Sequence, residues 1–354
     1  MINEEYFNVV CSEKIISITE KYSLRIIYCN SFGGFGLKLL KAKGLENFLR
    51  GRYKSISLFG NLHSNFLSAF TWYFYNLGYK VKTFSYSYNT NKSYNSIITE
   101  KHSENFSIYN SRKDCFEAFE NSVKEKKFLI PEFGIHKSAS DSLRILWDII
   151  VKKLFHVKHL FLEIGSGLTI SSLLYYLRKE GGVGLKDRNE SGKISNSNII
   201  KGNHFTSIPI ENLFGKIIFS INQNSEIVRY GDYKKENEFG GARPFPEIHG
   251  ICIGRRANRM KDELEKLYYD LYKDNLNYEN LIYQDPLIIS KFGKSNDRLT
   301  QFINDNSKKG VLLEPVYSGK TVFTISELAK QNNWEGEGLY IHQGGMGNFL
   351  SLFA

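Results

Sequence analysis

Cysteine is scarce in this sequence, and the few cysteines lie too far apart to suggest a metal site by spacing. The chain of 354 residues holds four of them. It contains no CxxC pair and no His/Cys cluster at metal-binding spacing. We therefore expect structural thiols in a reducing compartment and no metal ligand set. The four are Cys11, Cys29, Cys115 and Cys252.

Long apolar runs are also missing. The first ten residues, MINEEYFNVV, are acidic and lack the charged start and apolar stretch of a secretory signal. No apolar run is long enough to cross a bilayer. We expect a cytoplasmic protein without a membrane partner.

A compact basic run is the third absence. The formal net charge is +10, but the 47 lysines and arginines are scattered among 37 acidic residues. Such mixing argues against a nucleic-acid partner and favours a solvated surface that attracts small anions. What the chain does contain is apolar material, with 42% hydrophobic and 14% aromatic residues. This composition can supply the core of two domains or of one large one.

Strand-like and helix-like segments alternate along the chain, which predicts an α/β fold with parallel sheets flanked by helices. The polar stretch 88–96 and the region 180–247, which is rich in Gly, Asn, Ser and Lys, are predicted as loops. The predicted strands are 14–18, 24–29, 55–59, 81–86, 128–130, 159–164, 248–253 and 339–342. The predicted helices are 37–50, 64–77, 115–126, 140–154, a helix ending at 177, 260–272 and 324–331.

A polar group, His63-Ser64-Asn65, stands between the strand 55–59 and the helix that follows. In α/β sheets, ligands bind at such places, because free backbone N–H groups and the positive end of a helix converge there. A Ser or Asn at this position is equally typical of a helix cap without further function. Both interpretations stay open at this point.

A small-residue turn, Gly165-Ser166-Gly167-Leu168-Thr169, follows the apolar strand 159–164 and precedes a helix. Its backbone N–H groups can surround a phosphate, and the hydroxyls of Ser166 and Thr169 add donors. An ordinary tight turn with a cap is the alternative. The same segment resembles the first motif of S-adenosylmethionine-dependent methyltransferases, in which Glu163, Gly165 and Gly167 would approach the cofactor.

Three lysines, Lys38, Lys41 and Lys43, lie close together in a predicted helix. A lysine becomes a nucleophile when desolvation or a neighbouring cation lowers its pKa, and the trio supplies neighbouring cations. The alternative is a solvated basic helix face. Further on, Tyr317-Ser318 places two hydroxyls on a predicted loop, and Gln343-Gly344-Gly345 follows the last strand as a turn or a close approach to a ligand.

Taken in order, these segments resemble the pyridoxal-phosphate enzymes of fold type II, and most of all the 1-aminocyclopropane-1-carboxylate deaminase / D-cysteine desulfhydrase family. The resemblance covers most of the chain outside 180–247. The matching segments are Lys41-x-Lys43-x-Leu45-Glu46, Gly60 to Phe66, Leu77-Gly78, Ile130 to Gly134, Ile164 to Thr169, Glu314 to Lys320 and Ile341 to Gly345.

The resemblance implies a larger cofactor-binding domain from residues 1–48 and 141–354, a smaller α/β domain at 49–140, and a homodimer. It assigns pyridoxal 5'-phosphate as cofactor, with Lys41 as its covalent anchor. The cofactor phosphate would lie at Gly165, Ser166, Gly167, Leu168 and Thr169, and Ser318 would meet the pyridine nitrogen. The residues implied at the substrate are His63, Ser64, Asn65 and Tyr317, with Lys41, Ser64 and Tyr317 as the catalytic set.

Several positions depart from the family's pattern. Leu39-Leu40 replaces the Gly-Asn before the lysine, Phe66 replaces a histidine, Gln343 a threonine, and Phe292 stands where a second tyrosine is expected. We expect a deaminase or lyase that removes the α-proton of a small amino acid and releases ammonia and a 2-oxo acid. The alternative is a degenerate homologue that serves as a binding or interaction protein.

Overall fold

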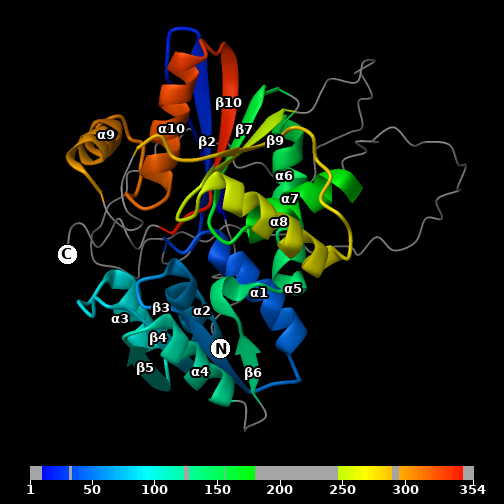
Figure 1. Cartoon of the computed structure of the whole chain (residues 1–354), viewed down its shortest axis with the longest axis vertical. Coiled ribbons are helices and arrows are strands. Elements are labelled where there is room, and N and C mark those ends of the chain that lie inside the picture. The colour runs from blue at the N-terminus through cyan, green and yellow to red at the C-terminus, as the bar shows by residue number, and fades with distance from the viewer. Residues whose placement is uncertain are drawn as a thin grey trace, which may run out of the picture.

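The computed structural model describes residues 10–31, 34–122, 127–154, 156–179, 246–288 and 295–345. Its two sheets lie one above the other in Figure 1, each covered by helices. The predicted loop region 180–247 lies outside the described residues, apart from Pro246 and Glu247. Phe292 also lies outside them. Within the described residues, no helix is both long and apolar enough to span a membrane.

The larger sheet has six strands in the order β1-β2-β10-β7-β8-β9. Strand β1 runs antiparallel to β2, and all other neighbours are parallel. The strands are β1 (Val10–Ser17), β2 (Tyr22–Asn30), β7 (His159–Ile164), β8 (Glu247–Cys252), β9 (Leu281–Gln284) and β10 (Gly336–His342).

Both faces of the larger sheet are buried, which explains the near-continuous apolar sequence of its central strands. Along β7, Leu160 and Leu162 face one core while Phe161 faces another. The first core includes α6 (Arg144–Leu154), α7 (Leu168–Lys179) and α8 (Ala257–Tyr272). The second includes α9 (Asp297–Ser307) and α10 (Ser318–Gln331).

The smaller sheet has four parallel strands in the order β5-β4-β3-β6. They are β3 (Ser55–Asn61), β4 (Lys80–Tyr86), β5 (Asn105–Tyr109) and β6 (Phe128–Ile130). Its helices are α2 (Asn65–Asn76), α3 (Tyr94–Lys101) and α4 (Arg112–Asn121). All four strands fall within 49–140; the division of the chain into two domains at these bounds stays a prediction.

Helix α1 (Leu37–Leu49) lies between the two sheets, beside the short α5 (Lys137–Asp141) (Figure 1). Its side chains belong to both cores: Leu37 and Leu40 pack with the larger sheet, and Leu39 and Leu45 with the smaller one. Gly44, within this helix, lies against α5, where an added Cβ would come within 2.4 Å of the Ser138 carbonyl oxygen. The glycine therefore allows close helix packing rather than interrupting the helix.

The fold-class prediction is confirmed, and two local predictions are wrong. The polar stretch 88–96 is not loop throughout, because α3 begins at Tyr94 after a capping box formed by Ser93 and Ser96. Tyr317 and Ser318 do not lie on a loop, because Ser318 is the first residue of α10 and Tyr317 is its N-cap.

Candidate active site

The predicted site residues gather where β7 and β10 end. These two strands are parallel neighbours, so their carboxyl ends meet at the same edge of the larger sheet. The turn at Gly165 follows β7, and Gln343 follows β10. Helix α1 brings Lys41 to this edge, where its amine contacts the first turn of α7.

Lys41 is buried, with 1% of its surface exposed. Its Nζ donates a hydrogen bond of 2.7 Å to Oγ1 of Thr169. Burial lowers the pKa of Lys41 well below its usual value, and the nearby charge of Lys38 lowers it further. The neutral amine is the nucleophilic form of lysine. A solvated basic helix face is therefore the wrong interpretation for Lys41.

A chain of polar contacts continues from Thr169 to the next strands. Thr169 donates from Oγ1 to Oε1 of Gln343 over 2.6 Å. The Gln343 amide in turn donates to the Glu163 carbonyl at 2.7 Å and to its carboxylate at 3.1 Å. The hydroxyl of Tyr340 donates to the other oxygen of that carboxylate. These contacts fix Thr169 in one orientation toward Lys41.

Glu163 is a candidate functional residue to which the pyridoxal-phosphate resemblance assigned no role. It lies near the carboxyl end of β7 and is 6% exposed, and burial raises its pKa to about 7. A carboxyl group in such a position holds or releases a proton near neutral pH. The signal in the sequence was an acidic residue within an otherwise apolar strand. Tyr340 and Gln343, the partners of Glu163, lie too far along the chain for sequence spacing to reveal these contacts.

The turn from Gly165 to Gly167 has the geometry of an anion-binding loop at the start of a helix. Gly167 has φ +83°, a backbone conformation that glycine adopts without strain. Gly165 faces the Tyr317 ring, 3.8 Å from where its Cβ would lie. The Leu168 N–H points toward Ser166 Oγ at 3.5 Å, a marginal contact. The first N–H groups of a helix have no partner within the helix itself, so the start of α7 suits an anion.

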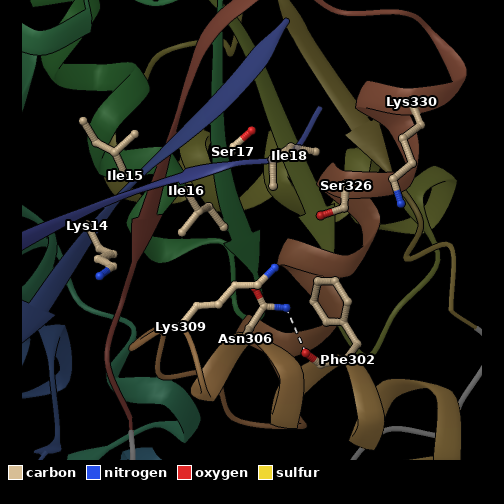
Figure 2. Close-up of a pocket in the computed structure, with 10 residues that line it drawn as sticks. All are labelled: Lys14, Ile15, Ile16, Ser17, Ile18, Phe302, Asn306, Lys309, Ser326 and Lys330. Carbon is tan, nitrogen blue, oxygen red and sulfur yellow. Dashed lines mark hydrogen bonds between the residues drawn. The ribbon is translucent and has the colours of Figure 1, made fainter. Parts of the chain in front are cut away.

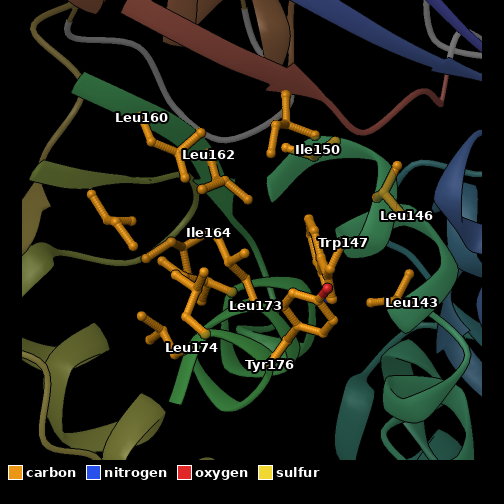
Figure 3. Close-up of a cluster of buried hydrophobic side chains, with 14 of the residues drawn as sticks. Leu143, Leu146, Trp147, Ile150, Leu160, Leu162, Ile164, Leu173, Leu174 and Tyr176 are labelled. Carbon is orange, nitrogen blue, oxygen red and sulfur yellow. The ribbon is translucent and has the colours of Figure 1, made fainter. Parts of the chain in front are cut away.

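The helix behind this turn is packed firmly. Figure 3 shows Leu173 and Tyr176 of α7 beside Trp147 of α6. The Trp147 indole donates to Ser172 Oγ over 2.9 Å, and the Tyr176 hydroxyl donates to Asp148 over 2.6 Å. The packed core holds the turn in place, which a preorganised binding site requires.

The three polar residues before and at the start of α2 have different roles. Ser64 is the N-cap and accepts a hydrogen bond from the Leu67 N–H, so the cap interpretation is confirmed for it. Asn65 donates to the Gly345 carbonyl over 3.0 Å and therefore joins α2 to the chain after β10. His63 instead pairs its ring with Ser93 and Asn89. The structure thus brings Asn65, but not the His63 ring, to the glycines beyond β10.

Ser318 and Tyr317 are positioned by Glu314. The Glu314 carboxylate accepts the N–H groups of Val316, Tyr317 and Ser318 at 2.6 to 2.8 Å. The Ser318 hydroxyl, fully buried, accepts from the Glu314 N–H over 2.8 Å. Burial raises the pKa of Tyr317 far above its usual value, so its hydroxyl stays protonated.

A surface cavity of about 470 Å³ lies elsewhere, between β1, α9 and α10. Figure 2 shows Lys14 and Ile16 of β1 facing Phe302 and Asn306 of α9 across it. None of the predicted site residues lines this cavity. The candidate active site is thus defined by its converging polar groups rather than by this cavity.

These residues fit pyridoxal phosphate. The cofactor needs a neutral lysine amine, an anion-binding turn nearby and a partner for its pyridine nitrogen. Lys41 and the Gly165–Gly167 turn supply the first two, and Thr169 connects them directly. Ser318 supplies a neutral hydroxyl at the start of α10.

The fold is that of the pyridoxal-phosphate enzymes of fold type II. An ACC deaminase homologue shares it with a TM-score of 0.63 at 16% identity, over 92% of this chain and 85% of that one. A hydrogen sulfide-producing enzyme from Fusobacterium nucleatum has a TM-score of 0.56 at 10% identity, and the match covers 95% of this chain and 93% of that one. A pyridoxal 5'-phosphate-dependent aspartate racemase has a TM-score of 0.53 at 10% identity, and the match covers 96% of this chain and 90% of that one.

The sequence comparisons give a different result. No model of a protein family matches this chain, and no curated protein sequence matches it either. The structural likeness confirms the predicted fold type II architecture. The methyltransferase interpretation of the Gly165 turn has no support from this fold.

Proposed function

We propose that this chain is a pyridoxal-phosphate enzyme that acts on a small amino acid by elimination or deamination, releasing ammonia and a 2-oxo acid. The observation that carries the proposal is the buried amine of Lys41, whose pKa burial lowers and which is hydrogen-bonded to Thr169 of the Gly165–Thr169 turn. A deaminase homologue and a hydrogen sulfide-producing enzyme among the structural neighbours support this reaction class.

When bound, the cofactor supplies an electron sink that stabilises negative charge at the substrate α-carbon. Lys41 holds it and carries protons to and from that carbon. The N–H groups of the turn, together with Ser166, bind the phosphate, and Leu168 contributes the first N–H of α7. The neutral hydroxyl of Ser318 meets the ring nitrogen. Tyr317, whose ring lies across from Gly165, would give a proton to the group that leaves the amino-acid substrate.

The N-terminus of α2 orients the substrate. The backbone N–H of Asn65 lies at the positive end of this helix and suits a carboxylate, whereas the Ser64 N–H donates to the Asn61 carbonyl over 3.0 Å. Asn65 is held from both sides, since its amide donates to Gly345 and accepts from Asn95 over 2.7 Å. His63 is held by its own contacts, since its N–H donates to Asn61 Oδ1 and its carbonyl accepts from Asn95, each over 3.0 Å. We also propose a homodimer in the cytoplasm, which sedimentation and fractionation would test.

The first test is an absorbance spectrum of the purified chain with added pyridoxal phosphate, followed by borohydride reduction and peptide mass spectrometry. We expect a yellow protein with the cofactor trapped on Lys41. The Lys41→Ala variant should lose the band, because it removes the amine that contacts Thr169 of the turn. Lys43→Ala is the matched control and should keep it. A colourless wild-type protein, or a label on Lys38 or Lys43, contradicts the assignment.

A second candidate function, cofactor binding without turnover, is favoured by the surroundings of Phe66. This residue replaces a histidine of the resembling family, and its ring packs on Phe70 at 4.6 Å within the apolar core. A phenyl ring supplies neither an acid nor a base at this position. A yellow protein that releases neither ammonia nor a 2-oxo acid from a panel of D- and L-amino acids would support this second function over the first.

A further inference from the structure

Two buried histidines and a glutamate meet at the edge of the larger sheet opposite to the candidate active site. His159 is the first residue of β7 and pairs directly with Glu247, the first residue of β8. His249 lies two residues beyond Glu247, and side chains two apart on a strand share a face. The register of two parallel strands therefore brings together three residues that are remote in sequence.

The distances among their ligand atoms are those of a metal site. Nδ1 of His159 and Nε2 of His249 are 3.2 Å apart, and each lies 3.4 Å from the same oxygen of Glu247. A zinc ion with ligands at 2.0–2.1 Å in tetrahedral geometry separates its ligand atoms by roughly 3.3 to 3.4 Å. The three atoms thus form one face of such a tetrahedron.

The two imidazoles are held in place before any ion arrives. They are 8% and 4% exposed. The Trp334 ring stacks on His159 at 4.2 Å, and the Phe161 ring stacks on His249 at 4.9 Å. Preorganised ligands reduce the cost of binding.

We propose that His159, His249 and Glu247 bind a divalent transition-metal ion of the zinc class. Imidazole and carboxylate ligands without thiolate suit this class, and the exposed side of Glu247 leaves the fourth position to water. The ion joins the first residues of β7 and β8, and its function is structural: it fastens two central strands whose connection passes through more than sixty residues. The site is independent of pyridoxal phosphate.

The test uses the full chain, freed of metal with a chelator, and a zinc titration in competition with a chromophoric chelator. We expect one equivalent bound, a rise in the unfolding temperature with zinc, and visible absorbance bands of tetrahedral cobalt when Co²⁺ replaces it. In His249→Gln and His159→Gln the affinity should fall by at least roughly tenfold, and the zinc-dependent rise should disappear.

Two further variants keep the result decisive. Glu247 is half exposed, so Glu247→Gln should fold normally and still bind zinc about tenfold more weakly. His156, exposed and close by in sequence, provides the control His156→Gln, which should bind as the wild type does. Undiminished zinc binding in the His159, His249 and Glu247 variants overturns the proposal. So does a wild-type chain that binds no zinc, which would leave the two imidazoles as a hydrogen-bonded pair.

Discussion

Lys41 and Glu163 are both buried at the candidate site, and for both burial favours the neutral form. The resemblance preferred Lys41 over Lys38 and Lys43, because only Lys41 has Glu46 at the distance found in the family. It gave Glu163 no role in binding pyridoxal phosphate, since the contacts of Glu163 with Tyr340 and Gln343 form only when β7 and β10 pair. Local patterns reveal residues that act with near neighbours and miss those whose partners are brought by the fold.

Glu163 makes a specific contribution to the pH dependence of stability. Its pKa is raised from 4.5 to about 7 in the folded chain, so the unfolded chain loses this proton first as the pH rises. The free energy of unfolding should therefore decrease between pH 4.5 and 7 and stay lower above, by roughly 3 kcal/mol (about 2.5 in pKa at 1.36 kcal/mol each).

Glu163→Gln removes this titration and keeps an oxygen that accepts from Tyr340. Urea unfolding of the wild type and of this variant at pH 5 and pH 8 isolates the contribution of Glu163. We expect the difference between the two proteins to change by roughly 3 kcal/mol between these pH values, with the variant gaining relative stability at pH 8. The exposed Glu20→Gln is the control and should follow the wild type. An unchanged difference would mean that Glu163 is ionised throughout.

At the scale of elements, the sequence predicted best what is buried on both sides. Strand β7 is buried at every residue and was predicted with its full length. The missed strands, β5 and β9, lie at the edges of their sheets and are only partly buried, so they lack a continuous apolar run. Helix α3 was missed because its first residues are polar and serve the cap.

The start of α7 offers a matched pair of substitutions. An alanine at Gly167 would have a strained φ of +83° and a Cβ 2.7 Å from Leu264 Cδ1. Gly167→Ala should therefore destabilise the fold by about 1 to 3 kcal/mol. At Gly165 the nearest atom would be 3.8 Å away, so Gly165→Ala should stay within about 0.5 kcal/mol of the wild type.

The two variants separate folding from binding. The methyl group of Gly165→Ala enters the space in front of the turn, and the affinity for pyridoxal phosphate should drop about tenfold, or 1.4 kcal/mol. Urea unfolding and a fluorescence titration with the cofactor measure the two effects. Normal cofactor affinity in a normally folded Gly165→Ala would show that the phosphate does not lie against this turn.

At the scale of the whole molecule, helix α1 joins the two sheets into one unit. Its side chains enter both cores, with Leu40 in the core of the larger sheet and Leu45 in that of the smaller. The candidate anchor Lys41 lies between these faces. The sequence predicted a helix here with an interruption at Gly44, but not its position between the sheets, because that position depends on contacts with α2, α5 and α7.

Because α1 packs against both sheets, we expect the two sheets to unfold together. Of the three tryptophans, Trp72 lies in α2 beside the smaller sheet, while Trp147 and Trp334 pack against the larger one. In a Trp72→Phe background, tryptophan fluorescence therefore reports on the larger sheet alone. Leu45→Ala opens a cavity on the side of α1 that faces the smaller sheet and should destabilise the chain by about 2 to 5 kcal/mol.

If α1 couples the sheets, this distant change must lower the urea midpoint seen by Trp147 and Trp334, and by the same amount as the midpoint seen by far-UV circular dichroism. Leu45→Met, which conserves volume, is the control and should cost less than about 1.5 kcal/mol. If the fluorescence midpoint stays at the wild-type value while the circular dichroism shows an earlier, partial transition, the sheets unfold separately. In that case Lys41 and the Gly165 turn would be held together only in the fully folded chain, and cofactor release should precede unfolding of the larger sheet.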